Sequence, residues 1–202
     1  MKRIFVIVVV LLCTMVVSAQ IRIVDNFDGA TALDWNEHAD KDVSALVKMG
    51  ALDLEVHKEG FYVFCSSDLP ILFEYDFKII IKLIVPKIDE KNQFGILFDM
   101  DENFNRLAFM FQEDKFIACP YNRGKFMDEM GEELKIKLPK ARNKNMEVVI
   151  ERKGGKIIVS YDNMEVLRWK RHLNSPYLGF ITSSHLKVDE VIIEQAYTGG
   201  EM

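Results

Sequence analysis

The sequence predicts an all-β protein built as an antiparallel sandwich of two sheets. Apolar and charged residues alternate with a period of two in segment after segment, and short polar turns separate these segments. Sustained helical spacing of apolar residues occurs in no window of the sequence. Many short strands at regular spacing, joined by hairpin turns, are typical of a β-sandwich.

The first residues are expected to be removed rather than folded. Residues 1–19 have the pattern of a secretory signal peptide, in which two basic residues precede an apolar stretch that ends in small residues at Ala19. The apolar stretch is too short for a comfortable membrane span, and the leucines before Cys13 argue against a lipid anchor. We expect a single exported domain, 20–202, with no membrane span, located in the periplasm or at the extracellular surface.

Alternation is clearest in two segments of the expected domain. Leu52, Leu54 and Val56 share one face of a strand, and the run Phe73–Val85 places seven apolar side chains on one face. The other expected strands are Ile21–Phe27, Phe61–Ser66, Phe94–Met100, Arg106–Gln112, Lys115–Pro120, Met146–Arg152, Lys156–Tyr161, Met164–Trp169, Tyr177–Thr182 and Leu186–Gln195.

Turn residues separate these strands. Lys153-Gly154-Gly155 and Asp162-Asn163 suit the positive φ angles that tight hairpins need. Met127–Met130 has the spacing of a single helical turn inside a long connection. The apolar parity of the last strand changes across Asp189-Glu190, which predicts a β-bulge there.

Charge and cysteine content limit the function. The formal net charge is −5, which disfavours a nucleic-acid binder, because such a protein needs a basic surface to neutralise phosphates. Cys65 and Cys119 remain after removal of the leader. An exported compartment permits a disulfide between them, but two small buried hydrophobic side chains explain them equally well.

The order of short motifs resembles the concanavalin A-like lectin/glucanase superfamily, in its short laminin G-like bacterial branch. The matching segments are Val24–Asp28 followed by Trp35, Phe94–Phe98, Asp101–Phe104, the hairpin Met146–Tyr161, Leu178–Phe180 and Val188–Ile193. The resemblance implies a jelly roll of two curved antiparallel sheets, with Trp35 packed under the first loop. It implies a choice among sugar-binding modules, laminarinase-type glucanases and calcium-dependent adhesion modules.

The catalytic pattern of the glucanase branch is incomplete. That branch carries an E-x-D-x-E strand with two glutamates at the distance that retaining glycosidases need. The nearest string here is Ala51–Glu55, in which Ala51 takes the place of the nucleophile. The sequence therefore predicts that the protein is not an enzyme.

Two groups of oxygen-bearing residues are weak candidates for a structural calcium, and no other cofactor is expected. Asp25, Asp28 and Asp189 are gathered if the first and last strands lie side by side, as they commonly do in this fold. The segment Asp99–Asn105 begins like a calcium loop, but Phe104 replaces the required glycine, so a hairpin tip is the better interpretation.

The candidate ligand-binding residues are Tyr121, Arg123, Trp169 and Arg171. Tyr121 and Arg123 follow Pro120 in a connection that suits the rim of a groove, and Trp169 and Arg171 belong to the one strongly basic segment, Leu167–His172. We expect an exported binding module that recognises carbohydrate or a cell-surface ligand. The alternatives are a structural component that contacts proteins of an envelope complex and a glycan-active hydrolase with a non-standard site.

Overall fold

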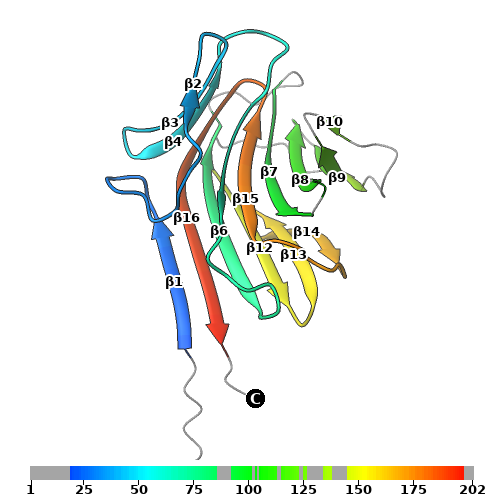
Figure 1. Ribbon diagram of the computed structural model, residues 1–202. Helices are drawn as coiled ribbons and strands as arrows, with labels where there is room; N and C mark the ends of the chain where they lie inside the picture. Colours follow the sequence, from blue (N-terminus) through cyan, green and yellow to red (C-terminus); the bar gives the residue numbers. More distant parts are fainter. Residues whose placement is uncertain are drawn as a thin grey trace, which may run out of the picture.

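A computed structural model describes residues 19–85, 92–101, 103, 105–112, 115–122, 125–126, 134–137 and 145–197, and these form two packed β-sheets (Figure 1). No helix occurs in these ranges, so none of them holds a helix that could cross a membrane. Residues 1–18 of the expected leader, Arg123 and the helical turn at Met127–Met130 lie outside the described residues, whereas Ala19, the last residue of that leader, begins the first strand.

The larger sheet has nine strands. Its order is β14-β13-β12-β6-β16-β4-β3-β2, and β1 also pairs with β16. Its strands are β1 (Ala19–Asp25), β2 (His38–Ala39), β3 (Val43–Lys48), β4 (Ala51–Val56), β6 (Phe77–Ile84), β12 (Asn145–Lys153), β13 (Lys156–Tyr161), β14 (Met164–Trp169) and β16 (His185–Tyr197).

The smaller sheet has seven strands. Its order is β10-β9-β8-β7-β15-β5, and β11 pairs with β9. Its strands are β5 (Val63–Asp68), β7 (Gln93–Met100), β8 (Arg106–Gln112), β9 (Lys115–Asn122), β10 (Lys125–Phe126), β11 (Leu134–Lys137) and β15 (Tyr177–Thr182). All strand pairs among the described residues are antiparallel, as the sequence predicts.

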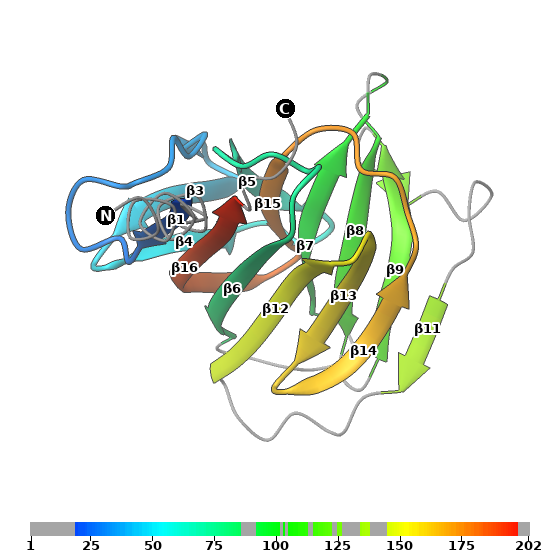
Figure 2. The ribbon, with the colours of Figure 1, turned by 90° about the horizontal axis from the view of Figure 1, so that it is seen from below.

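The inner faces of the two sheets enclose the main core (Figure 2). Phenylalanines dominate it: Phe98 is fully buried, and its ring centroid lies 5.5 Å from that of Phe73 and 6.3 Å from that of Phe109. Such an aromatic layer buries a large apolar area in defined geometry. The all-β, two-sheet jelly-roll prediction is confirmed.

Several local predictions are confirmed. Asp162 and Asn163 have φ angles of 44° and 66°, and Gly154 and Gly155 also have positive φ, as tight hairpins require. The register of β16 against β6 shifts between Val188 and Glu190, where the parity change predicts a bulge.

Two predictions of strand extent were wrong. The strand expected over Phe73–Val85 begins only at Phe77, because the residues before it form a turn in which the Tyr75 amide donates to the Leu72 carbonyl. The strand Val43–Lys48 was not predicted, although its hairpin partner Ala51–Val56 was. Cys65 and Cys119 point to opposite faces of the seven-stranded sheet, so they do not pair with each other.

Candidate functional site

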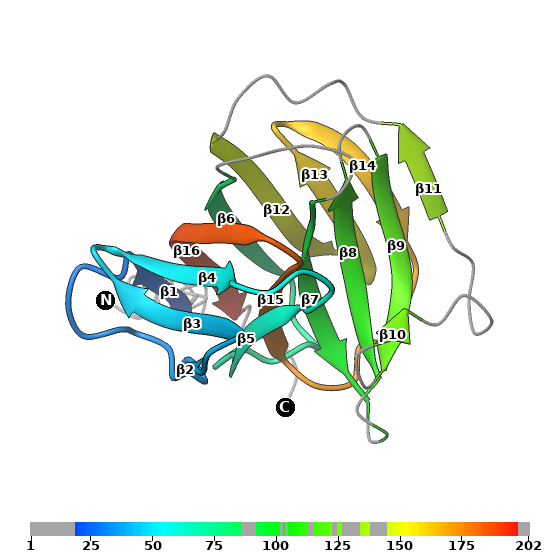
Figure 3. The same cartoon turned by 90° about the horizontal axis from the view of Figure 1, so that it is seen from above.

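The outer face of the seven-stranded sheet, which points away from the main core, carries a second apolar cluster. Side chains alternate along these strands: Ile96 and Phe98 belong to the main core, while Leu97 between them belongs to the second cluster. The members of this cluster are Leu97, Ala108, Met110, Cys119, Tyr121, Tyr177 and Ile181. Figure 3 shows the five strands that carry most of this face, β5, β15, β7, β8 and β9.

Two tyrosines of this cluster and three side chains beside it form what we call the aromatic face, defined as Tyr62, Phe64, Arg106, Tyr121 and Tyr177. The guanidinium carbon of Arg106 lies 5.0 Å from the ring centroid of Tyr177 and 6.0 Å from that of Phe64. Arg106 and Tyr121 are also directly opposite each other in the β8–β9 ladder. A cation stacked on two aromatic rings is held in place by their π-faces.

Two buried polar atoms of the aromatic face lack partners. Neither Nε of Arg106 nor the hydroxyl of Tyr177 has a hydrogen-bond partner among the described residues. A buried polar group without a partner is costly, by about 1–3 kcal/mol, so each such atom in a native structure needs an explanation. A ligand that supplies hydroxyl or carbonyl oxygens is one explanation.

The rings of the aromatic face differ in exposure. Tyr62 and Phe64 are each 39% exposed, whereas Tyr121 and Tyr177 are buried. The Tyr62 hydroxyl donates to Oε1 of Gln93 at 2.7 Å, which fixes the ring. Burial raises the pKa of Tyr62 and of Tyr121. For Tyr121 the positive charge of Arg106 opposes this shift of the pKa, while Tyr62 and Tyr177 add to it.

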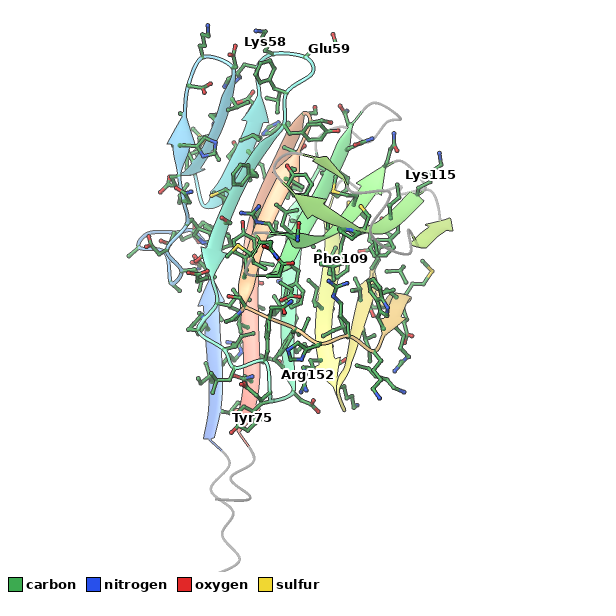
Figure 4. The ribbon with its side chains drawn as sticks, turned by 45° about the vertical axis from the view of Figure 1, so that its right-hand side comes forward. Lys58, Glu59, Tyr75, Phe109, Lys115 and Arg152 are labelled. Carbon is green, nitrogen blue, oxygen red and sulfur yellow. The ribbon has the colours of Figure 1, made fainter. Side chains whose placement is uncertain are left out.

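A second pocket, of about 510 Å³, is lined by the segments that precede β6 and β15. We call it the Arg152 pocket. Its polar lining comprises Glu74, Arg152, Arg171, His172 and Asn174, and its apolar lining includes Phe73 and Leu173. In Figure 4, Arg152 and Tyr75 lie far from Lys58 and Glu59, the turn that precedes Tyr62.

The predicted ligand-binding residues are divided between these two places. Tyr121 is part of the aromatic face, Arg171 lines the Arg152 pocket, and Arg123 is outside the described residues. Trp169 packs against the main core, and the Arg171 guanidinium lies 5.4 Å from its ring centroid. The structure therefore places Tyr121 and Trp169 in different apolar clusters.

Four residues of the aromatic face were missed by the sequence interpretation: Tyr62, Phe64, Arg106 and Tyr177. A signal was available, because Tyr62 and Phe64 alternate with the buried Val63, and Tyr177 precedes the buried Leu178. Without knowing which strands share a sheet, these residues could not be placed on one face.

The carboxylates considered as calcium ligands are largely bound by groups of the protein itself. Asp25 is buried, and its carboxylate accepts hydrogen bonds from the Leu33 amide at 3.2 Å and from Nε1 of Trp35 at 2.8 Å. Trp35 thus packs beneath the first loop, as the resemblance implies. Within the described ranges, Asp25, Asp28 and Asp189 do not come together as a group that could hold a metal ion.

The aspartates of the Asp99–Asn105 segment are hairpin and loop anchors. Asp101 accepts from the Asn103 and Asn105 amides and from the Asn105 side chain, and this last bond is the main reason why the pKa of Asp101 is lowered. Asp99 is buried, and it accepts from the amides of Asn174 and Ser175 at 2.6 and 3.1 Å. Asp99 thereby fixes one wall of the Arg152 pocket.

The sequence matches no protein-family model and no curated protein. Solved structures do share the fold. The Bacillus licheniformis β-glucanase is 10% identical, with a TM-score of 0.60 over 85% of this chain and 97% of that one. The laminarinase from Flavobacterium sp. UMI-01 is 9% identical, with a TM-score of 0.61 over 84% and 97%. The Emp47p carbohydrate recognition domain is 8% identical, with a TM-score of 0.60 over 85% and 93%.

These neighbours confirm the concanavalin A-like jelly-roll fold, and they include both carbohydrate-recognition domains and glucanases. They also correct one prediction. The missing E-x-D-x-E strand led to the expectation that the protein is not an enzyme, but most of the structural neighbours are glucanases and laminarinases. That expectation is overturned, because one absent motif is too narrow a basis for excluding catalysis on a fold with so many glycan-cleaving members.

Proposed function

We propose that this protein recognises carbohydrate chains at the aromatic face. The observation that carries the proposal is the combination of two half-exposed rings, Tyr62 and Phe64, with the unpartnered Nε of Arg106 and the unpartnered hydroxyl of Tyr177. Sugars in water bind through their apolar faces, which stack on aromatic rings, and through hydroxyls, which need donors and acceptors nearby.

The arrangement of the face supports an extended ligand rather than a single small molecule. Tyr62 directly precedes β5 and the other residues come from β5, β8, β9 and β15, so the face is spread across most of the width of the seven-stranded sheet. Arg106 lies near both Phe64 and Tyr177 and presents a planar donor between them. A β-glucan chain suits such a surface, and the neighbours named as β-glucanase and laminarinase favour this class.

Cleavage of the bound glycan is the second candidate function. It is favoured by the neighbours, most of which are glucanases and laminarinases. A third candidate is a protein contact within an envelope complex, in which the same exposed rings would meet a protein surface. All three proposals include export to the periplasm or the extracellular surface, as the signal-peptide pattern of residues 1–19 suggests.

The experiment is calorimetric titration of residues 20–202 with laminarin and with mixed-linkage β-glucan. We expect saturable binding that Phe64→Ala and Tyr62→Ala each weaken about tenfold, because each substitution removes a stacking ring. Tyr75→Ala is the matched control, since Tyr75 is 38% exposed, like Tyr62 and Phe64, but belongs to the segment before β6 and lies far from Lys58 and Glu59 in Figure 4.

The same samples are assayed for release of reducing ends. New reducing ends whose rate of release falls in the Phe64→Ala variant would establish cleavage at this face, whereas binding alone would establish recognition. Equal weakening by Tyr75→Ala and Phe64→Ala would contradict the placement of the site. Absence of binding to either glucan would contradict the β-glucan proposal, and retention of an envelope protein on the immobilised chain would then favour the third candidate.

A further inference from the structure

The Arg152 pocket is built where the nine-stranded sheet is covered by two crossing segments instead of by strands. One segment, residues 69–76, leads from β5 to β6, and the other, residues 170–176, leads from β14 to β15. In Figure 4 the second segment crosses in front of the sheet beside Arg152. Both segments contribute to the lining of the pocket, and Arg152 comes from the end of β12.

The walls of this pocket are held by buried hydrogen bonds. Gln195, which is 1% exposed, accepts from the Leu72 amide at 3.0 Å and donates to the Leu72 carbonyl at 2.7 Å. On the other side, the buried Asp99 carboxylate accepts hydrogen bonds from the backbone amide and from the side-chain amide of Asn174. Preformed walls favour binding, because less conformational freedom is lost when a ligand arrives.

The charged lining is positive in a protein whose net charge is −5. The lining contains two guanidinium groups, Arg152 and Arg171, and one carboxylate, Glu74. Asp76 is not in the lining; it pairs with Nη1 of Arg152 at 3.3 Å and accepts from the Gly154 amide at 3.0 Å.

Both guanidinium groups are oriented by their neighbours. Nη1 of Arg152 also donates to the Glu74 carbonyl at 2.9 Å, which leaves the rest of its planar fork for other acceptors. Arg171 is positioned by the ring of Trp169. Planar donor forks fixed in this way match the geometry of a carboxylate, which accepts two parallel hydrogen bonds from one arginine.

The remaining lining is apolar and includes Ile71, Phe73, Leu173 and Pro176. A volume of about 510 Å³ lies within the range of small-molecule sites. The pocket thus combines an apolar wall with fixed cationic donors, which is the complement of a ring that carries an acid group.

We propose that the Arg152 pocket binds a carboxylate-bearing ring, such as a uronic acid, with the carboxylate held by Arg152 and Arg171. The acid is either free or the end of an acidic glycan, since both present the same chemistry. This site is separate from the aromatic face, and the proposal does not depend on the proposed function.

The test is calorimetric titration of residues 20–202 with glucuronate, with glucose as the neutral counterpart of the same shape. We expect saturable binding of glucuronate and at least about tenfold weaker binding of glucose, because charge-assisted hydrogen bonds are lost. Arg171→Gln should weaken glucuronate binding about tenfold. Glu74→Gln should strengthen it about two- to fivefold, because a like charge is removed from the lining.

Arg168→Gln is the matched control. It changes the net charge by the same amount as Arg171→Gln. Arg168 lies on β14, three residues before Arg171, but it is exposed and pairs with Glu165 outside the pocket. Equal loss on Arg168→Gln and Arg171→Gln, or equal affinity for glucuronate and glucose, would overturn the proposal. So would absence of saturable glucuronate binding, whatever the aromatic face does.

Two further arms complete the design. A galacturonate tetramer that binds more tightly than glucuronate, with the same response to Arg171→Gln, identifies the end of an acidic glycan as the ligand; a weaker tetramer identifies a free acid. Phe64→Ala, which should weaken glucan binding at the aromatic face, should leave glucuronate binding unchanged. A loss of glucuronate binding in this variant would contradict the separation of the two sites.

Discussion

The outer faces of the two sheets differ in how their polar groups are satisfied. On the nine-stranded sheet, charges pair across neighbouring strands: Arg22 with Glu194 at 3.3 Å, and Lys82 with Glu190. On the seven-stranded sheet, the outer face carries an apolar cluster surrounded by aromatic rings, and two of its buried polar atoms have no partner in the described ranges.

The outer face of the nine-stranded sheet satisfies its own charges, whereas the outer face of the seven-stranded sheet has polar atoms that a ligand could bind. Charges that pair within a sheet face are satisfied in water and need nothing more. Exposed rings such as Tyr62 and Phe64, next to buried polar atoms without partners, are less stable alone than when a ligand covers them. The contrast therefore supports the aromatic face as the location of the carbohydrate site that we propose.

The largest expected effect tests whether the outer cluster is a second core. Phe98→Ala should lower the free energy of unfolding by about 3–5 kcal/mol, because it leaves a large cavity in the main core. Leu97, next to it on β7, points to the outer cluster, so Leu97→Ala should cost less, about 2 kcal/mol. Urea unfolding measures both. Equal costs would mean that the outer cluster is packed as a core and is not a surface prepared for a ligand.

The next effect concerns the charge pairs of the nine-stranded sheet. The Asp53 carboxylate is buried and contacts Nε2 of His185 at 2.7 Å, Nζ of Lys187 at 3.4 Å and Nζ of Lys48 at 3.5 Å. Asp53→Asn should lower the free energy of unfolding by about 2 kcal/mol, since three cationic or polar partners lose their acceptor charge.

Glu55→Gln is the matched control on the same strand. Glu55 is only partly buried and pairs loosely with Lys48, at 3.9 Å, so its loss should cost less than about 0.5 kcal/mol. Neither variant should change the affinity for β-glucan. If Asp53→Asn is fully folded but binds β-glucan more weakly, the ligand contacts the outer face of the nine-stranded sheet, contrary to our proposal.

A smaller effect of opposite sign is expected at Tyr177. Because its buried hydroxyl has no hydrogen-bond partner among the described residues, Tyr177→Phe should raise the free energy of unfolding by about 1 kcal/mol. The same change should weaken glucan binding several-fold, since the hydroxyl is expected to bond to the ligand. Thermal unfolding and calorimetry measure the two effects. A lower free energy of unfolding would show that the Tyr177 hydroxyl already has a hydrogen-bond partner in the free protein. The aromatic face would then have no unpaired hydroxyl for a ligand.

Most of the fold follows from alternation, and much of the site does not. Alternation finds a strand and divides its residues into two sets, as it did at Leu52, Leu54 and Val56. It cannot decide which strands are neighbours, so the approach of Arg106 to Phe64 and Tyr177 had no signal in local sequence. Strand order depends on long-range pairing, which no short window contains.

Carboxylates were ambiguous for a different reason. Asp25 is followed by turn residues, and an aspartate in that position serves equally well as a calcium ligand or as an acceptor for backbone amides. The structure shows the second role, with Asp25 holding the Leu33 amide and the Trp35 indole. Sequence alone lists the donors and acceptors, and only the fold decides which of them meet.

The last comparison is between a tyrosine of the main core, Tyr161, and a tyrosine of the aromatic face, Tyr62. Tyr161 packs on the core side, where burial, with a smaller contribution from Asp162, raises its pKa to about 12. Burial also raises the pKa of Tyr62 on the aromatic face. An unfolded tyrosine loses its proton near pH 10, so between about pH 10 and 12 the folded chain keeps the Tyr161 proton that the unfolded chain has lost.

Stability from Tyr161 is therefore fully present below about pH 10 and declines as the pH rises towards 12, and Tyr161→Phe should flatten this decline. Phenolate absorbance follows the titration, with Tyr62→Phe and Tyr161→Phe assigning the two groups. Bound laminarin should raise the pKa of Tyr62 further, because a sugar that covers the ring removes more water from it, and should leave Tyr161 unchanged. A shift at Tyr161 with none at Tyr62 would move the ligand away from the aromatic face and undo the distinction between the two sheets.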